Sequence, residues 1–307
     1  MSKPNISVSF AGITLRNPTI LASGILGVTK SSLKYVIKHG AGACVIKSIS
    51  LEPRSGHRAP NMHPVEGGFL NAVGYSNPGL EEAKREFLHL SDLRAPVIAS
   101  IIGKDAEEFA KNAELFLSDE FAAVEAVLSC PHTPGYGTLA GQGSPEATEK
   151  ITKAIRAKTK LPLFIKLSPQ SEPISEVAKA AEAGGADGIT AINTAGPGMY
   201  IDIKTRASVL HFGMGGLSGP ALRPIAVRCV YDIYKSVKIP IIGVGGIQSG
   251  RDAIEMMMAG AQAVQIGTGI YYKGIDVFKQ VTDEIKIFME EEGIKKLSEI
   301  VGAAHKK

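Results

Sequence analysis

The stretch "PIIGVGGIQSGRDAIEMMMAGAQAVQIGTG" at residues 240–269 decides the fold. It opens and closes with short apolar runs, at 240–246 and 263–269, and residues 251–259 between them have helical composition and spacing. Each run is nearly continuous in apolar character, as expected of a strand buried on both faces of a parallel sheet. Gly260, just before the second run, suits a helix C-cap. The stretch therefore predicts one strand–helix–strand unit of a parallel α/β fold.

Six further runs of the same kind precede this unit, which makes eight in all. They lie at 18–24, 43–49, 96–103, 122–129, 161–169 and 187–194, and segments such as 147–158, 173–184 and 221–237 have helical composition. Eight alternating units are typical of a TIM (β/α)8 barrel. A doubly wound sheet is the alternative, but "LASGILG" after the first run does not fit its glycine fingerprint. We expect a single barrel domain over 1–307, with long connections at 50–90 and 195–220 over its site.

The composition limits the classes of protein to consider. The chain has 307 residues, 44% hydrophobic content and a net charge of only +4, which does not favour a nucleic-acid partner. Cys44, Cys130 and Cys229 form neither a disulfide framework nor a CxxC metal site, which indicates a reducing compartment. No signal peptide and no apolar run long enough to span a bilayer is evident. We expect a cytoplasmic protein with no metal site and no membrane partner.

The chemistry of a TIM barrel lies where its strands end. Two lysines, Lys47 and Lys166, end apolar strands, where an unpaired ammonium is costly to bury. No Asp or Glu stands at the strand ends, so an anionic or electron-rich ligand is favoured over Lys–carboxylate bridges. The other polar residues at strand ends are Ser23, Ser48, Ser100, Ser129, Cys130, Asn193 and Thr194.

Three glycine-rich segments predict a phosphate-bearing ligand. "GVGGIQSG" and "QIGTG" follow the last two strands, where barrels commonly bind phosphate. In "GMGGLSGPALRPIA" at 213–226, Ser218 is expected to N-cap a helix with Gly219 and Pro220 in its first turn. FMN fits best, with Lys166 near N1 and C2=O of the flavin. Pyridoxal phosphate fits less well because its chemistry gives Cys130 no role. A non-redox barrel that holds a phosphorylated substrate is a further alternative.

Several long motifs also resemble a known family. They are "KSISLEPRSGH" (47–57), "GGFLNAVGYSNPG" (67–79), "SCPH" (129–132), "IKLSP" (165–169), "AINT" (191–194) and "GGLSGPALRPIA" (215–226). In order, over nearly the whole chain, they resemble class 1 dihydroorotate dehydrogenase, most closely the catalytic subunit of the B type. The resemblance implies FMN-dependent oxidation of dihydroorotate to orotate in pyrimidine biosynthesis. It also implies a homodimer at the core of a heterotetramer, with an FAD/iron–sulfur subunit linking it to NAD.

The resemblance assigns roles by position. Cys130 would remove the proton from substrate C5, while hydride passes from C6 to flavin N5. From the residues alone, Cys130 could equally be a catalytic base or an inert buried thiol. Cys44 and Cys229 are expected in the core. The implied substrate contacts are Lys47, Asn71, Ala72, Val73, Gly74, Tyr75, His132, Asn193 and Thr194. The implied FMN contacts are Ser23, Lys47, Ser48, Ser100, Lys166, Ile192, Gly219, Gly245, Gly246, Gly267 and Thr268.

Three positions depart from the family pattern. Val127 and His132 stand where the family usually has Asn, and Ser100 stands where B-type members often have Asn. These changes affect the substrate contacts rather than the cofactor. The "SCPH" variant with "GQG" at 141–143 also resembles the FMN domain of dihydropyrimidine dehydrogenase. Direct electron transfer to fumarate, or an assembly subunit whose site has decayed, are further readings that the sequence leaves open.

Overall fold

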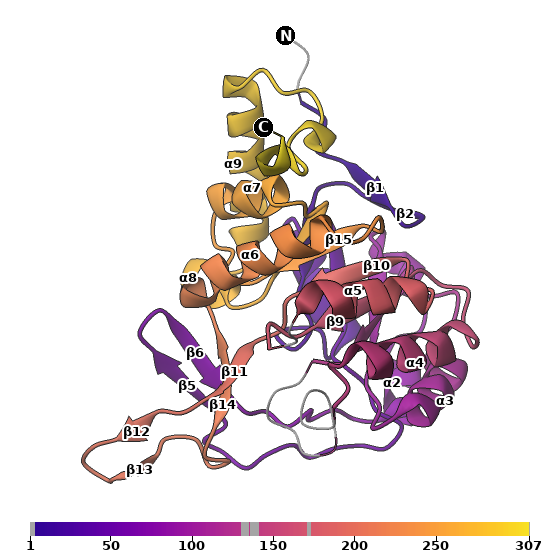
Figure 1. Cartoon of the computed structure of the whole chain (residues 1–307), viewed down its shortest axis with the longest axis vertical. Coiled ribbons are helices and arrows are strands. Elements are labelled where there is room, and N and C mark those ends of the chain that lie inside the picture. The colour runs from indigo at the N-terminus through magenta and orange to yellow at the C-terminus, as the bar shows by residue number, and fades with distance from the viewer. Residues whose placement is uncertain (1–3, 130–134, 136–140, 171–172, 307) are drawn as a thin grey trace.

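Eight parallel strands close into a barrel (Figure 1). The structure, a computed structural model, describes residues 4–129, 135, 141–170 and 173–306. In order around the barrel the strands are β3 (Thr19–Leu21), β4 (Ala43–Val45), β7 (Val97–Ile101), β8 (Ala123–Val127), β9 (Leu163–Leu167), β10 (Gly188–Ala191), β15 (Ile241–Val244) and β16 (Ala263–Ile266). Each falls within one of the eight predicted runs, and β16 pairs with β3 to close the circle. The predicted TIM barrel is confirmed, and an open doubly wound sheet is excluded.

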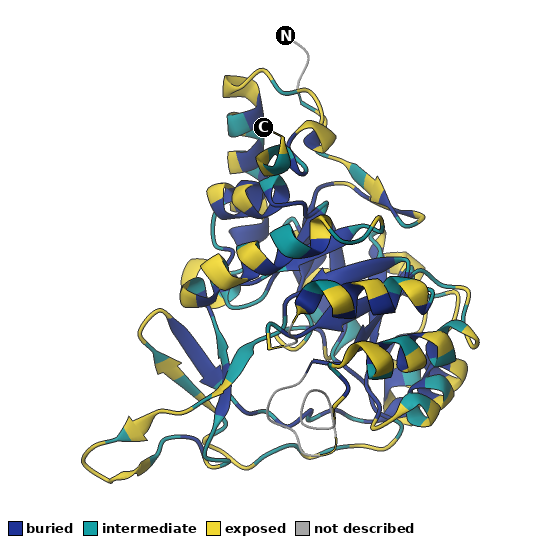
Figure 2. Ribbon diagram, viewed as in Figure 1, coloured by how far each residue is buried: buried dark blue, intermediate teal, exposed yellow. Residues whose placement is uncertain are grey.

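Helices between the strands cover the outside of the barrel (Figure 2). They are α1 (Lys30–Lys38), α2 (Leu80–Glu86), α3 (Ala106–Phe116), α4 (Pro145–Arg156), α5 (Ile174–Ala183), α6 (Arg223–Tyr234), α7 (Gly250–Met258), α8 (Gly269–Lys273) and α9 (Val277–Glu291). Side chains of Thr29, Asp105, Ser144 and Ser249 cap the starts of α1, α3, α4 and α7, satisfying backbone N–H groups that a helix leaves unpaired. None of the described helices has the length and apolar character needed to cross a membrane.

A hairpin at the N-terminus closes the end of the barrel where the strands begin. Strands β1 (Val8–Phe10) and β2 (Ile13–Leu15) pair antiparallel. Their buried residues Phe10, Ile13 and Leu15 join a core cluster with residues of the barrel strands, among them Phe164 and Ile242 near the starts of β9 and β15. The Phe10 and Phe164 rings meet edge to face, with centroids 6.0 Å apart. Among the described residues, this hairpin fills the end of the barrel where the strands begin, which leaves the opposite end for a ligand site.

The two long connections pair with each other at that opposite end. Strands β5 (Met62–Val65) and β6 (Gly68–Asn71) come from the first connection, and β11 (Ala195–Gly198) and β14 (Gly215–Ser218) from the second. They form one antiparallel sheet in the order β11-β14-β6-β5, here called the mouth sheet. A short ribbon, β12 (Ile201–Asp202) with β13 (Ala207–Ser208), extends beyond it (Figure 1). The sequence predicts that both connections lie over the site, but it does not predict that they pair in one sheet.

The predicted N-cap role of Ser218 is wrong. Ser218 ends β14 and lies opposite Phe69 of β6, so its backbone is committed to the mouth sheet. The turn η3 (Pro220–Leu222) follows, with Gly219 at its N-cap and no side-chain cap bond. Helix α6 begins only at Arg223. Pairing between distant strands has overridden the local capping preference.

Candidate active site

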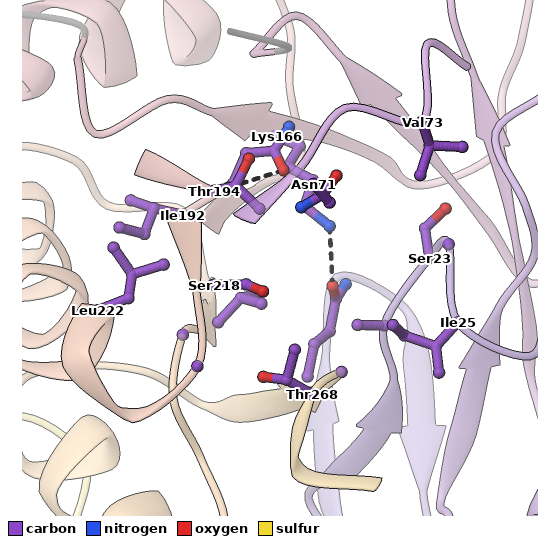
Figure 3. A pocket seen from close by; sticks show the side chains of 18 of the residues that line it. Ser23, Ile25, Asn71, Val73, Lys166, Ile192, Thr194, Ser218, Leu222 and Thr268 are labelled. Carbon is purple, nitrogen blue, oxygen red and sulfur yellow. Dashed lines mark hydrogen bonds between the residues drawn. The ribbon is translucent and has the colours of Figure 1, made fainter. Parts of the chain in front are cut away.

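A cavity of about 230 Å³ lies at the carboxyl ends of the barrel strands, beside the mouth sheet (Figure 3). Strand ends and both long connections supply its walls. The predicted site residues that line it are Ser23, Lys47, Ser48, Asn71, Val73, Gly74, Tyr75, Lys166, Ile192, Asn193, Thr194, Gly219, Gly245, Gly246, Gly267 and Thr268. Residues predicted for substrate and residues predicted for FMN therefore meet around one cavity. Cys130 and His132 lie outside the described residues.

Two predicted contacts, Ala72 and Ser100, do not line the cavity. Ala72, which directly follows β6, is fully buried in a small cluster with Leu70 and Leu210. Ser100 is also fully buried, and its Oγ lies 2.9 Å from the Oγ of Ser48. Ser48 in turn lies 3.2 Å from Ser23, whose hydroxyl donates to a backbone carbonyl. Ser100 therefore reaches the cavity only through Ser48.

One end of the cavity is lined by glycines whose backbone leaves no room for a side chain. Gly219 has φ +106°, Gly245 has φ +137° and Gly246 has φ +69°. A Cβ on Gly245 would lie 2.6 Å from the Cβ of Ala226, and a Cβ on Gly246 would lie 2.8 Å from the carbonyl oxygen of Gly219. Bare backbone from two distant segments thus forms this wall, which suits close approach to an anionic group.

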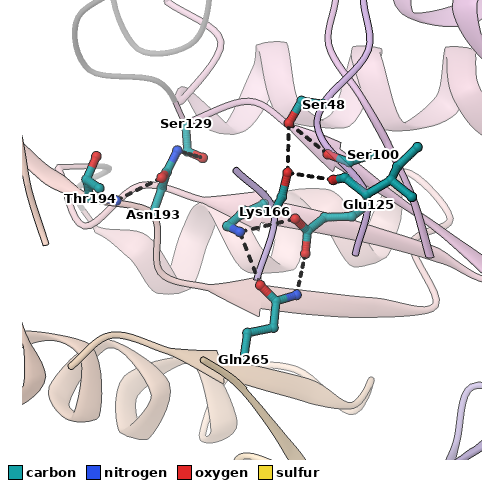
Figure 4. A network of polar contacts seen from close by, with 10 residues as sticks. Ser48, Ser100, Glu125, Ser129, Lys166, Asn193, Thr194 and Gln265 are labelled. Carbon is teal, nitrogen blue, oxygen red and sulfur yellow. Dashed lines mark hydrogen bonds and ion pairs between the residues drawn. The ribbon is translucent and has the colours of Figure 1, made fainter. Parts of the chain in front are cut away.

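Lys166 belongs to a buried polar ring beneath the cavity (Figure 4). Its Nζ lies 3.1 Å from Oε1 of Glu125 and 3.2 Å from Oε1 of Gln265. Gln265 Nε2 donates to the other oxygen of Glu125 at 2.6 Å. At 5%, 1% and 1% exposure, the three residues share a site almost without water.

The expectation that no carboxylate pairs with the strand-end lysines is therefore wrong for Lys166. Glu125 lies inside β8, two residues before the strand ends, so an inspection limited to strand ends misses it. The signal was present, since a Glu within "AAVEAVLS" and a Gln within "AVQIG" interrupt apolar runs. Polar groups in such positions need partners because their burial is costly otherwise.

The amide of Asn193 is held in place at the cavity wall. Its Nδ2 donates to Ser129 Oγ at 3.0 Å, and its Oδ1 accepts from the backbone N–H of Thr194 at 2.8 Å. Asn71 is held across the mouth sheet, where its Nδ2 donates to the carbonyl of Gly216 at 3.2 Å. Both amides are thus preset in orientation, as positions that recognise a polar ligand should be.

Val127 makes part of the cavity wall apolar at a position where the family usually has Asn. The residue is 4% exposed, lines the cavity and packs with Tyr75 and Ile102. The Val127 side chain is therefore accommodated by apolar packing within the cavity wall.

The two described cysteines are core residues, as predicted. Cys44 is fully buried in β4, and burial raises the pKa of its thiol to about 12. Burial also raises the pKa of the Cys229 thiol, in α6, to about 11. Thiols with such raised pKa values are poor nucleophiles and bases at neutral pH. Among the residues that the structure describes, no cluster of His, Cys, Asp or Glu could hold a metal ion.

The closed barrel and its cavity at the carboxyl ends of the strands define a TIM-barrel enzyme. Residues 5–289 match the family described as dihydroorotate dehydrogenase. Two similar proteins are both named dihydroorotate dehydrogenase B (NAD(+)), catalytic subunit. The one from Methanocaldococcus jannaschii is 47% identical, over 99% of this chain and 100% of its own, and the one from Methanothermobacter thermautotrophicus is 47% identical over 98% of each. The chain belongs to the dihydroorotate dehydrogenase family.

Solved structures agree on the fold. A ligand-free dihydroorotate dehydrogenase from Eimeria tenella superposes with a TM-score of 0.86, at 24% identity over 100% of this chain and 93% of its own. The structure of that enzyme with ferulenol gives a TM-score of 0.83, at 23% identity over 99% of this chain and 89% of its own. The family is flavin-dependent, and oxidation of dihydroorotate is the activity that membership indicates. The predicted resemblance to a B-type catalytic subunit is confirmed by the relatives.

Proposed function

We propose that this chain oxidises dihydroorotate to orotate with FMN as its cofactor. The observation that carries the proposal is the cavity itself, where a glycine-walled end and a buried, ion-paired lysine flank the same space. A phosphate needs approach to backbone N–H groups, and a flavin ring needs a cation near N1 and C2=O. The chain offers both around one cavity, in a family that uses flavin.

The residues present fit FMN. Gly219, Gly245 and Gly246 would hold the phosphate, because neighbouring atoms leave no room for a Cβ at these positions and the backbone is exposed to the cavity. Gly267 and Thr268 line the same cavity and would contribute further contacts to the phosphate. The flavin ring would lie against Ser23, Lys47, Ser48, Lys166 and Ile192, which line the rest of the wall. When bound, the flavin accepts at N5 the hydride that leaves C6 of the substrate.

The chain's own residues would bind the substrate and remove its proton. Asn193 and Thr194 would hold the pyrimidine edge, and Lys47 and Asn71 would also hold the substrate. The amides of Asn71 and Asn193 already have a fixed orientation. From its sequence position, Cys130 would take the proton from C5. It follows directly on Ser129, which accepts the hydrogen bond from Asn193.

We further propose that residues 1–307 act as a single FMN-binding domain paired with an FAD/iron–sulfur subunit that passes electrons to NAD. The relatives' description as catalytic subunits supports a partner chain, and a homodimer at the core of a heterotetramer is the assembly proposed. The cytoplasm is the proposed location. Both described cysteines are free thiols, as is usual in a reducing compartment.

The test is anaerobic reduction of the FMN-loaded protein by dihydroorotate, followed as bleaching of the flavin absorbance. Cys130→Ala should keep the flavin spectrum and slow bleaching by about 10²–10⁴-fold, the usual contribution of a general base. Cys229→Ala makes the same change at a core thiol and should bleach at the wild-type rate. A protein that stays colourless with FMN, or a Cys130→Ala variant with wild-type bleaching, would refute the proposal. Faster turnover with uracil or thymine and a reductant would favour a dihydropyrimidine reductase.

A further inference from the structure

Glu125 does not line the cavity, yet its carboxylate contacts a residue that does. The side chain is 1% exposed within an apolar strand, where an unpartnered carboxylate is strongly disfavoured. Both of its oxygens are used, Oε1 by Lys166 and Oε2 by Gln265. The role assigned to Lys166 from the sequence requires only the lysine, so the other two members of the ring need a separate explanation.

Gln265 links the two charged groups. Its amide oxygen accepts from Lys166 and its amide nitrogen donates to Glu125, so each member of the ring contacts the other two (Figure 4). An ammonium group has three N–H donors. Glu125 and Gln265 take two of these donors of Lys166, which leaves one for a ligand in the cavity that Lys166 lines. The ring therefore fixes where that remaining donor lies.

The charges of the ring cancel, because the ammonium of Lys166 faces the carboxylate of Glu125 at 3.1 Å. In a site nearly free of water such charges act strongly on their neighbours. Reduction places negative charge near N1 and C2=O of a flavin, and a lone cation beside it would favour the reduced form. A paired carboxylate opposes that preference.

We propose that Glu125 is a positioning residue that, with Gln265, holds Lys166 and offsets its charge, so that the ring sets the reduction potential of the bound flavin. The proposal rests on the proposed function, namely FMN held against Lys166. Glu125, which lies outside the cavity, would thereby adjust the reduction potential of the flavin to that of its electron acceptor. Two electrons have to leave the flavin after each turnover, and too high a potential would prevent that.

The test uses Glu125→Gln, which keeps the shape of the side chain and removes its charge. FMN bound to this variant should have a midpoint potential higher by at least about 30 mV, which is a tenfold shift in the two-electron equilibrium. The measurement is anaerobic titration against a reference dye, followed by flavin absorbance. Thr190→Val is the matched control. Thr190 lies opposite Lys166 on the neighbouring strand, and its buried hydroxyl has no hydrogen-bond partner among the described residues. The midpoint potential of FMN bound to Thr190→Val should equal that of FMN bound to the wild type.

A second comparison separates the charge effect from a merely structural one. In a Lys166→Met background the ammonium that Glu125 faces is gone, so Glu125 has no lysine charge to offset. The shift in potential caused by Glu125→Gln should then vanish. An unchanged potential in the single variant, or an equal shift in both backgrounds, would overturn the proposal.

Folding failure is also informative. If Glu125→Gln does not fold but Glu125→Gln/Lys166→Met does, the charge balance between the two residues is supported. If neither folds, Glu125 serves the fold rather than the flavin, and the proposal is overturned. A wild-type protein that takes up no FMN would instead refute the proposed function, and the two failures are thereby distinguished.

Discussion

Gly219→Ala should damage the glycine-walled end of the cavity. Gly219 has φ +106° and ψ −171°, a backbone conformation that essentially only glycine adopts. Its missing side chain faces β6, where a Cβ would lie 2.6 Å from the Cα of Gly68 and 3.0 Å from the carbonyl oxygen of Gly67. The substitution therefore combines backbone strain with a clash against the mouth sheet.

The size of the effect follows from these two contributions. Strain at such a position costs about 1–3 kcal/mol. Carbon atoms in ordinary contact stay about 3.5–4.0 Å apart, so the Gly68 backbone has to shift by roughly 1 Å. That shift moves the start of β6 against β14 and displaces Gly219 from the cavity wall. We expect FMN affinity to fall at least tenfold, or about 1.4 kcal/mol.

Gly213→Ala is the matched control. Gly213 lies in the same connection at φ +88°, but a Cβ there would meet nothing within 4 Å, and the residue does not line the cavity. The Gly213→Ala variant should lose about 1–3 kcal/mol of unfolding free energy, measured in urea. Its FMN affinity, measured by fluorescence quenching, should equal that of the wild type. Equal FMN affinities for the two variants would show that the clash with Gly68 does not shape the cavity.

Two further predictions concern the core. Leu15→Ala, at a fully buried position in the hairpin that closes the barrel, should lower the free energy of unfolding by about 2–5 kcal/mol in urea, with FMN affinity unchanged; a loss below 1 kcal/mol would mean that the hairpin is dispensable. The thiol of Cys44 has its pKa raised from 9.0 to about 12 in the folded state, so its stabilisation is complete below pH 9 and is lost as pH rises toward 12. Stability should fall by about 1.4 kcal/mol per pH unit in that window through this thiol alone, and Cys44→Ala should flatten the measured slope by that amount.

The barrel could be predicted because its signal is local. Each strand is an apolar run bounded by turn residues, and burial on both faces makes the run continuous, so the strand can be recognised without knowing which side chains point into the barrel. The glycine-rich segments after β15 and β16 are equally local signals, and their residues line the cavity. These features follow from neighbours in the sequence, so no knowledge of distant pairing was needed.

The parts that sequence reasoning missed depend on contacts between distant residues. Glu125 and Gln265 are 140 residues apart, and only the closed barrel brings them to Lys166. Ser218 has the composition of a helix cap, but its pairing with Phe69 keeps it in a strand. Ser100 lies near the end of its strand, as other predicted site residues do, yet Ser48 lies between it and the cavity. In each case a partner far along the chain decides the outcome.

The mouth sheet also has a consequence for the order in which the protein can fold. Asn71 and Gly216, which it joins, are 145 residues apart, so their contact closes a long loop. Loop closure of this kind is entropically costly and tends to come late. A nascent chain could assemble its first six barrel strands and still lack Gly219 and the glycines after β15. Ligand uptake in the cavity would then mark completion of folding, and the cofactor would select finished molecules over partly folded ones.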